Sequence, residues 1–242
     1  MVLDHTHATA PSFAYWLVMP AAGLGARMQA GSDDCPKQYR FLVGQTVIEH
    51  ALAPFIDDPQ CVGIVVALHA EDSWFSKLAV ARHTKVLSTI GGATRRDSVL
   101  AGLQLLGQRS VAKDHWVWVH DAARPCVRRT DLDALKAALS AYPDVALLAV
   151  RVSDTLKRAD HLGRVAATVP RDDVWRALTP QAFRLEALTA ALQRCPTATD
   201  ESSAMEASGF LPRLVAGASD NVKITEQRDL ALAEQILRER SS

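Results

Sequence analysis

The sequence predicts an α/β fold, a doubly wound and mostly parallel sheet with a projecting β-arm. Short apolar runs recur along the chain, amphipathic segments separate them, and one polar stretch interrupts this alternation. Strands that alternate with helical segments are typical of a parallel sheet with helices on both faces. The chain has 242 residues, 48% of them hydrophobic, which is enough for one substantial core.

Short apolar runs are the predicted strands, at 14–19, 62–68, 85–90, 116–120 and 146–150, with a further short strand at 213–215. They have the apolar character of strands that are buried on both faces. Ligands of such sheets bind at the carboxyl ends of the strands. Polar motifs follow the first, third and fourth runs, so we expect three loops to converge on one pocket.

The segments between the strands carry helical periodicity, and helices are expected over 47–53, 98–106, 132–142, 183–192, 200–207 and 225–237. The first is expected to stop at Pro54, because proline interrupts helical hydrogen bonding. Val99 and Leu103 are spaced to lie on one helix face. Thr130 and Asp133 resemble a capping box at the start of the third helix.

Residues 151–174 break the alternation and are predicted to form an inserted arm. The stretch is polar, and its flanks at 155–157 and 164–169 can pair as a hairpin around the turn-like residues 160–163. An exposed hairpin carrying Val165 and Val169 is best covered by another subunit, so a homodimer is expected; the alternative is a surface loop. Residues 13–150 and 175–242 are then one domain, after a flexible tail at 1–12.

Composition excludes several partners. The 27 basic and 27 acidic residues give a net charge of zero, so we expect neither a nucleic acid nor a membrane as partner. The four cysteines show no Cys-x-x-Cys spacing and accompany no secretory leader, which favours reduced thiols in the cytoplasm. No apolar stretch approaches the roughly 18 residues of a membrane span.

A phosphate-binding loop is predicted directly after the first strand. Gly23 and Gly25 let backbone amides approach a ligand closely, and Arg27 and Lys37 add positive charge. No P-loop string is present, Met28 stands where the dinucleotide fingerprint needs a small residue, and neither a nucleophile elbow nor a His-Glu-x-x-His motif occurs. The remaining chemistry is attack on a nucleoside triphosphate by an oxyanion of the substrate, promoted by alignment and charge.

At this point a series of motifs closely resembles one enzyme family. They are Pro20-Ala21-Ala22-Gly23-x-Gly25-x-Arg27-Met28, Pro36-Lys37-Gln38-Tyr39, Gly91-Gly92 with Arg95 and Asp97-Ser98-Val99, His120-Asp121-Ala122-Ala123-Arg124-Pro125, Asp154-Thr155-x-Lys157, Leu178-Thr179-Pro180-Gln181, Thr199-Asp200-Glu201 and Asp220-Asn221-Val222-Lys223-Ile224-Thr225. Over roughly residues 14–236, in this order, they resemble the 2-C-methyl-D-erythritol 4-phosphate cytidylyltransferases. The resemblance implies a Rossmann-like nucleotidyltransferase that uses CTP, a methylerythritol phosphate and Mg²⁺.

The same resemblance implies roles at the nucleotide. Arg27 and Lys37 would be catalytic, holding the triphosphate and stabilising the charge at its α-phosphorus. CTP would be bound by Ala21, Ala22, Gly23, Gly25, Gly92, Ser98, Asp121 and Arg124, with cytosine selected by backbone groups and the Ser98 hydroxyl. Alternatively Gly91-Gly92 is only a turn, and Arg124 a tie within its loop. The position of Ala93 often carries an acidic side chain in this family, so its side-chain contact is in question here.

Metal and second-substrate roles follow in the same way. Asp121 would bind Mg²⁺ together with phosphate oxygens, or else cap the following turn, and Asp220 would be a second acidic contact to the metal or to a lysine. The alditol phosphate would be held by Thr155, Arg171, Thr179, Thr199 and Lys223. By the family pattern, Arg171 and Thr179 would reach the site from the arm of the partner subunit. The alternative for Thr199 is a role as the N-cap of the following helix.

Two other functions remain open on the sequence. One is a cytidylyltransferase for another alditol phosphate such as ribitol 5-phosphate, which would share the CTP half of the site. The other is a CTP-binding module without catalysis, which the presence of both Arg27 and Lys37 argues against.

Overall fold

A central seven-stranded sheet organises the computed structural model, which describes residues 13–23 and 35–240. The strand order is β11-β7-β10-β6-β1-β4-β5. The strands are β1 (Tyr15–Ala21), β4 (Cys61–Leu68), β5 (Val86–Ile90), β6 (Trp116–Val119), β7 (Ala146–Arg151), β10 (Trp175–Arg184) and β11 (Arg213–Ala216). All neighbours pair in parallel except β10, which runs antiparallel between β6 and β7. The predicted mostly parallel sheet is confirmed, and the tail at 1–12 lies outside the described residues.

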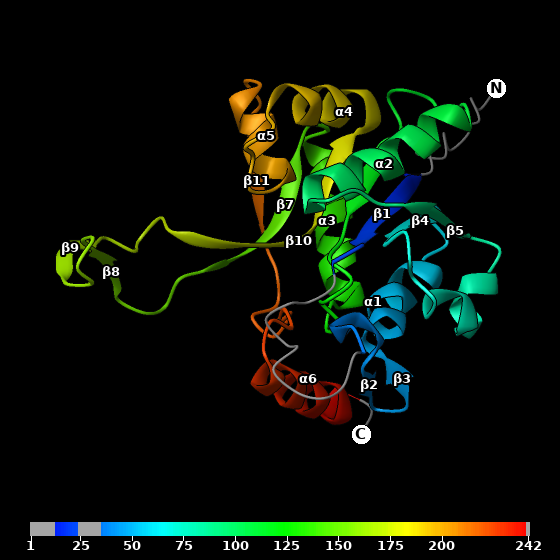
Figure 1. The fold of residues 1–242 in the computed structure, drawn as a ribbon. Coiled ribbons are helices and arrows are strands. Elements are labelled where there is room, and N and C mark those ends of the chain that lie inside the picture. The colour runs from blue at the N-terminus through cyan, green and yellow to red at the C-terminus, as the bar shows by residue number, and fades with distance from the viewer. Residues whose placement is uncertain (1–12, 24–34, 241–242) are drawn as a thin grey trace, which may run out of the picture.

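Helices cover both faces of the sheet (Figure 1). They are α1 (Val47–Ile56), α2 (Arg95–Gln108), α3 (Arg129–Ala141), α4 (Leu185–Arg194), α5 (Glu201–Ala207) and α6 (Gln227–Arg240). Because side chains alternate along a strand, Leu17 and Met19 pack with α1 and α3, whereas Val18 packs with α2, α4 and α5. The doubly wound arrangement is therefore confirmed.

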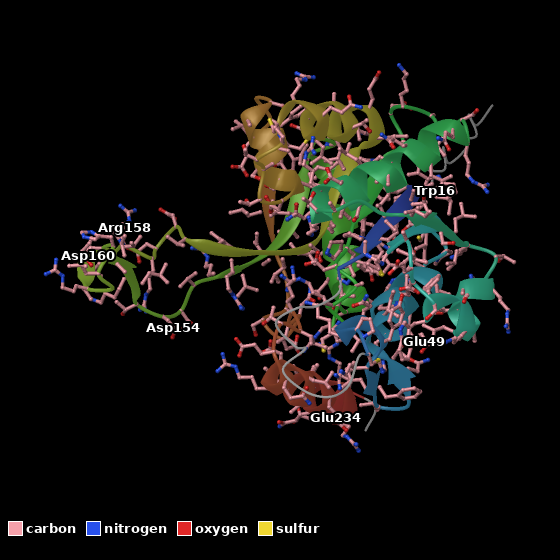
Figure 2. The ribbon with its side chains drawn as sticks, viewed as in Figure 1. Trp16, Glu49, Asp154, Arg158, Asp160 and Glu234 are labelled. Atoms are coloured by element: carbon pink, nitrogen blue, oxygen red, sulfur yellow. The ribbon has the colours of Figure 1, made fainter. Side chains whose placement is uncertain are left out.

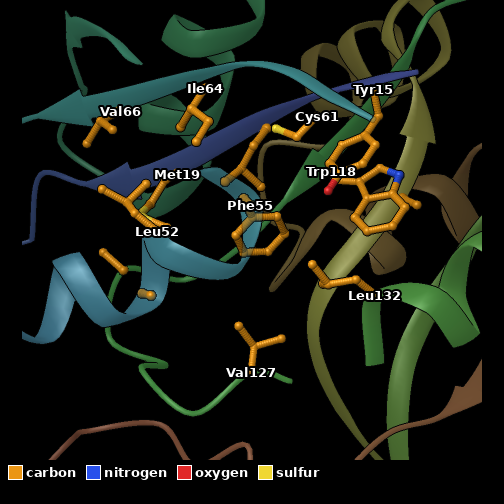
Figure 3. Packing of buried hydrophobic residues seen from close by; sticks show 14 of the residues in the cluster. Tyr15, Met19, Leu52, Phe55, Cys61, Ile64, Val66, Trp118, Val127 and Leu132 are labelled. Carbon is orange, nitrogen blue, oxygen red and sulfur yellow. The ribbon is translucent and has the colours of Figure 1, made fainter. Parts of the chain in front are cut away.

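The core on the α1 and α3 side is rich in aromatic residues. The Tyr15 and Trp118 rings stack with centroids 4.0 Å apart, and Phe55 of α1 lies beneath them (Figure 3). All three are fully buried. Burying side chains of this size contributes on the order of 2–3 kcal/mol each relative to leaving them exposed.

Two helix predictions were wrong in detail. Helix α1 does not stop at Pro54 but continues to Ile56, because buried Phe55 packs into the core and the Asp57 amide bonds to the Ala53 carbonyl. The capping box of α3 does not involve Thr130 and Asp133. Instead the Asp131 carboxylate accepts a hydrogen bond from the backbone amide of Arg128, the N-cap residue.

Strand β10 is the largest element that the sequence did not predict. The helix expected from residue 183 begins at Leu185, and Phe183 belongs to the strand. Pro180 is tolerated in the strand because the register shifts between Ala177 and Gln181, where no ladder bond needs its missing N–H.

Residues 151–174 project from the body as an arm, as expected (Figure 1). Strands β8 (Leu156–Ala159) and β9 (Val165–Val169) form an antiparallel hairpin around a turn that includes Gly163 at φ +76°. Asp154, Arg158 and Asp160 lie on this arm, away from the sheet (Figure 2). Val165 of this hairpin is exposed, so no described residue of the chain covers its side chain.

Helix α6 packs below the sheet on the short hairpin of β2 (Phe41–Leu42) and β3 (Gln45–Thr46). Its residue Glu234 faces outward at the lower edge of the molecule (Figure 2). Buried Ala233 contacts the cluster that contains Leu42, Cys126 and Ile224. None of the helices in the described parts of the chain is long and apolar enough to cross a bilayer.

Candidate functional site

A pocket lies at the carboxyl edge of the sheet, where the loops after β1, β5 and β6 meet. The convergence expected from the sequence is therefore confirmed. Its walls are formed by Pro20, Ala21, Ala22, Gly23, Lys37, Gln38, Gly92, Ala93, Thr94, Arg95, Ser98, Asp121, Ala122, Ala123 and Lys223. Many of the residues with proposed nucleotide roles line this one cavity, while Gly25 and Arg27 lie outside the described residues.

The loop after β1 is fixed at its base by Gln38. The Gln38 side-chain amide donates to the carbonyl oxygens of Ala21, at 3.1 Å, and Gly23, at 3.3 Å. Gln38 is buried and belongs to a single 3-10 turn, Lys37–Tyr39, which also presents Lys37 to the pocket. The two phosphate-binding segments of the sequence thus support one another.

The loop after β5 requires glycine for close packing. A Cβ atom on Gly92 would lie 2.3 Å from the Asp97 Cβ, and one on Gly91 would lie 2.8 Å from the Ala22 Cβ. The Ser98 hydroxyl is 3.2 Å from the Gly92 amide and 3.0 Å from the Thr94 carbonyl. Gly91-Gly92 is therefore a packed turn that Ser98 holds against the mouth of the pocket.

Asp121 is the central charge of the site and is 5% exposed. Its Oδ1 accepts from Arg95 Nε at 2.9 Å, and its Oδ2 lies 2.9 Å from Lys223 Nζ and 3.4 Å from Arg124 Nε. Burial by itself would raise the pKa of this carboxyl, but Arg95, Lys223 and Arg124 together hold the pKa well below its usual range. Asp121 is therefore a carboxylate with three cationic partners.

Arg95 joins Asp121 to a second buried carboxylate. Arg95 Nη1 lies 2.6 and 2.7 Å from the two oxygens of Glu201, which is 1% exposed. Burial raises the pKa of the Glu201 carboxyl, and Arg95 opposes that effect. The described ion pairs of the site thus combine two carboxylates with three cations, an excess of one positive charge on a pocket that Lys37 also lines.

A buried histidine fixes Thr179 beside Asp121. His120 Nε2 lies 3.1 Å from the Arg124 carbonyl, which only accepts, so Nε2 carries the proton and Nδ1 accepts from the Thr179 hydroxyl at 2.9 Å. That hydroxyl in turn accepts the Asp121 amide at 3.1 Å. Burial lowers the pKa of His120 to about 4, which keeps the ring neutral near pH 7.

The chain from Asn221 to Ile224 forms a strap beside the pocket, which its residue Lys223 lines. The side-chain amide of Asn221 donates to the Thr179 backbone carbonyl at 2.8 Å. The Arg124 guanidinium donates to the backbone carbonyl of Asn221 at 2.8 Å. Lys37 Nζ donates to the Ile224 carbonyl at 2.9 Å. These contacts hold the strap so that its Lys223 side chain reaches Asp121, and they assign Arg124 a role as a tie within the site.

Other expected residues lie elsewhere. Thr155 is exposed on the arm, and the Arg171 guanidinium, also on the arm, donates to the Ser153 carbonyl. Thr179 is in the sheet of its own chain and not in the arm, so its expected arrival on a partner's arm is wrong. Thr199 is exposed beside a neighbouring cavity, and the N-cap of α5 is Asp200.

Asp220 is also placed away from the pocket lining. Its carboxylate pairs with Arg128, and with Arg240 at 2.9 Å. Burial would raise the pKa of this carboxyl, but hydrogen bonds from both arginines lower it. Asp220 therefore ties α6 and the start of α3 to the strap, and nothing in its surroundings brings it to Asp121.

Among the described residues, Asp121 is the carboxylate that the pocket lining offers to a magnesium ion. Within residues 13–23 and 35–240, no group of three or more acidic, histidine or cysteine side chains could hold a metal. Mg²⁺ commonly takes one or two carboxylates and completes its shell with substrate phosphates and water. Asp121 is the matching carboxylate, but both of its oxygens are paired with cations here, so it would hold a metal only together with the phosphates of a bound nucleotide.

The sequence did not assign roles to Gln38, Arg95, His120 or Glu201. All four stand inside the quoted motifs, which was the available signal. Apart from the Arg124 carbonyl beside His120, their partners lie 15 to 106 residues away along the chain, so these contacts depend on the tertiary fold. Their place in the motifs indicated that these four residues belong to the site, and the structure shows the hydrogen-bond partners of each.

Comparisons with known proteins identify the family of this chain. Residues 15–239 match the family described as 2-C-methyl-D-erythritol 4-phosphate cytidylyltransferase. Curated members from Pseudomonas putida (strain W619) and Vibrio cholerae are 50% and 48% identical, over 92% and 90% of this chain and 95% and 93% of theirs. The crystal structure of the Francisella tularensis member superposes with a TM-score of 0.78 at 35% identity, covering 92% of this chain and 99% of that one. The chain belongs to the 2-C-methyl-D-erythritol 4-phosphate cytidylyltransferase family.

Proposed function

We propose that this protein transfers the cytidylyl group of CTP to 2-C-methyl-D-erythritol 4-phosphate. The products are 4-diphosphocytidyl-2-C-methyl-D-erythritol and pyrophosphate. The observation that carries the proposal is the single pocket that brings the family's glycine loops, Lys37, Asp121 and Lys223 together. Membership of the family, with relatives of about 50% identity that bear this name, supports the same activity.

The reaction is an in-line displacement at the α-phosphorus. A phosphate oxygen of the alditol phosphate forms the new P–O bond, and the bond to the β-phosphate oxygen breaks, so pyrophosphate leaves with its electron pair. The attacking phosphate is already ionised near neutral pH, so no general base is required. Lys37 and Arg27 supply positive charge to the triphosphate and to the more crowded transition state.

Different residues of the pocket bind the two substrates. Backbone groups of Ala21, Ala22 and Gly92 select cytosine at the wall that Ser98 orders, and Gly23 and Gly25 admit the phosphates. Lys223 binds the phosphate of the alditol, beside Thr179. Thr199 lies across the Arg95 wall in the adjoining cavity and contributes a hydroxyl at the alditol end.

Asp121 would hold Mg²⁺ together with phosphate oxygens of CTP, and the ion would supply charge neutralisation on the triphosphate. We expect Mg²⁺ binding to depend on the nucleotide, because Asp121 is the carboxylate among the described residues that lines the pocket. Calorimetric titration with Mg²⁺ should give no measurable binding without CTP, and tight binding of the metal alone would contradict this arrangement.

The arm provides a homodimer in which each site is composite. Thr155 and Arg171 are exposed on the arm and distant from their own pocket in sequence and fold, so they serve the partner's site. Sedimentation should show a dimer at micromolar concentration, and removal of residues 155–169 should give a monomer without turnover. A fully active monomer would contradict the composite site.

The reduced state of Cys61 and Cys126 supports a cytoplasmic location. Both carry free, buried thiols. Such thiols persist in a reducing compartment.

Pyrophosphate release tests the function. The purified protein should release pyrophosphate from CTP with methylerythritol phosphate and much more slowly with ATP, GTP or UTP. A panel of alditol phosphates that includes ribitol 5-phosphate separates the substrates. If ribitol 5-phosphate is turned over faster than methylerythritol phosphate, it is the substrate and the proposed substrate is wrong. CTP binding without pyrophosphate release would indicate a non-catalytic module.

A further inference from the structure

We propose that Arg95 and Glu201 form a positioning pair that sets the orientation of Asp121 and, through it, of Lys223. The proposal rests on the proposed function, because Lys223 is the group assigned there to the alditol phosphate. Neither Arg95 nor Glu201 is given a substrate contact. They act through Asp121.

The geometry divides the donors of one guanidinium between two carboxylates. Arg95 Nε meets Asp121 Oδ1 at 2.9 Å, whereas Nη1 meets both oxygens of Glu201 at 2.6 and 2.7 Å. Glu201 thereby fixes the plane of the guanidinium. Asp121 receives one bond from Arg95, and its other oxygen remains for Lys223 at 2.9 Å.

Without Glu201, the guanidinium is free to turn and to offer a second N–H to Asp121. Arginine and carboxylate groups favour such two-bond pairing. The second bond would fall on Oδ2, the atom that Lys223 now occupies. Lys223 would then leave Asp121 and swing away from its place in the pocket, because its side chain is 39% exposed and has room to move.

The pair is not needed to hold its helices. The first turn of α2 has its own capping box, in which Thr94 and Asp97 bond reciprocally, and Arg96 ties the helix to the Leu192 carbonyl. The first turn of α5 has an equivalent box between Asp200 and Ser203. Both helix ends are therefore satisfied without the pair, and Arg95 keeps Asp121 as an anionic partner, so removing the Glu201 charge lowers overall stability without unwinding either helix end.

Gln181 anchors α5 further. Its side-chain amide donates to Asp200 Oδ2 at 2.9 Å, and its Oε1 accepts the Ser202 amide at 3.0 Å. Because these bonds surround Glu201 without including it, replacing its charge should leave α5 in place. An effect of the substitution on turnover would then report on Asp121 and Lys223.

The experiment compares Glu201→Gln with Glu206→Gln as a matched control. Glu206 is exposed on the same helix and bonds to the Ser202 hydroxyl. Glu201→Gln should raise the KM for methylerythritol phosphate or lower kcat so that kcat/KM falls at least tenfold, with the KM for CTP within twofold. Glu206→Gln should match the native protein.

The double variant Glu201→Gln, Lys223→Met distinguishes a positioning role of Glu201 from a general disruption of the site. If Glu201 acts through Lys223, Glu201→Gln should add less than twofold to the loss caused by Lys223→Met alone. Independent, multiplying losses in the double variant would overturn the proposal. So would equal losses for both substrates in Glu201→Gln alone.

A measurement without substrate separates this inference from the function. Acylation of Lys223 by acetic anhydride, followed by mass spectrometry, should be several-fold faster in Glu201→Gln than in the native protein or Glu206→Gln, at a temperature where all three proteins are fully folded. Unchanged Lys223 reactivity would overturn the inference even in an active enzyme. Faster acylation in a protein that fails to turn over methylerythritol phosphate would leave the pair intact and overturn only the substrate assignment.

Discussion

The two ends of the central sheet each bury an aspartate among cations, and the difference between them separates a structural cluster from a functional one. At the amino end, Asp58 is fully buried and accepts from the Tyr15 hydroxyl at 2.9 Å, Lys136 at 3.1 Å and Arg129 at 3.2 Å. At the carboxyl end, Asp121 has a similar number of partners but faces a pocket. The composition of both clusters is similar, so type of residue alone does not identify the site.

Charge balance does distinguish them. At the amino end, Asp58 and Asp133 pair with Arg129 and Lys136, so the ion pairs within the described residues sum to zero. At the carboxyl end, three cations meet two carboxylates, and an additional lysine lines the same cavity. An excess of positive charge beside a cavity is what a polyphosphate requires, whereas a balanced and closed cluster stabilises only the fold.

Asp58→Asn should give the largest change in stability. It leaves Lys136 and Arg129 without their buried carboxylate, and breaking such a pair costs about 3–5 kcal/mol of unfolding free energy. Urea denaturation measures the loss, and kcat of the remaining folded protein should stay within twofold of native. A large loss of kcat in folded protein would break the distinction between the two ends.

Lys37→Ala and Arg27→Ala should act in the opposite way. Each removes charge from the transition state and should lower kcat on the order of 10²-fold or more, while the urea midpoint changes little. Steady-state pyrophosphate release and urea denaturation are the measurements. Near-normal turnover in either variant would refute its catalytic assignment.

Gly92→Ala should produce an intermediate effect confined to the carboxyl end. The added Cβ would lie 2.3 Å from the Cβ of Asp97, which the capping box holds in place, so the loop must move. We expect the KM for CTP to rise about tenfold, roughly 1.4 kcal/mol. Gly107→Ala is the matched control, because its Cβ would meet nothing within 4 Å, and an equal effect in both variants would argue against a role for the loop in CTP binding.

Thiol reactivity compares the two ends of the sheet without changing any residue, and it tests whether the core stays closed to solvent at each end. Burial raises the pKa of Cys61, near Asp58, to about 12, and that of Cys126, after the Asp121 loop, to about 11. Alkylation by iodoacetamide at pH 8 should therefore be about a hundredfold slower in the native protein than in urea, because the thiolate reacts. Rapid labelling of native Cys126 would show that the carboxyl end opens more widely than the pocket alone.

Much of this architecture could be predicted from the sequence because its signals are local. Buried runs such as 62–68 and 85–90 marked strands within a residue of their observed bounds, and the motifs after them marked the pocket. Strand β10 was missed because Leu178-Thr179-Pro180-Gln181 has no alternation, and its pairing partners come from β6 and β7. Its strand state is imposed by tertiary contacts rather than by local propensity.

The candidate site shows the same limit. Asp121 and Lys223 could be singled out by their motifs, but Glu201 meets Arg95 across 106 residues, a contact that no spacing rule predicts. Asp220 illustrates the converse, since an acidic residue in a site motif turned out to be bonded to arginines from two helical segments. Motifs in the sequence indicate which residues belong to a site, whereas the contacts of those residues depend on the tertiary fold.

The central place of β10 constrains how this chain can be made. Residues 175–184 follow β7 in translation order and yet lie between β6 and β7, so a nascent chain that ends before Trp175 exposes the unpaired edge of β6 and leaves β7 without a neighbour in the sheet. Open edges of this kind template intermolecular pairing. Fragments that end between residues 152 and 174 should consequently be insoluble, and residue 184 must leave the ribosome before β10 can close the sheet between β6 and β7.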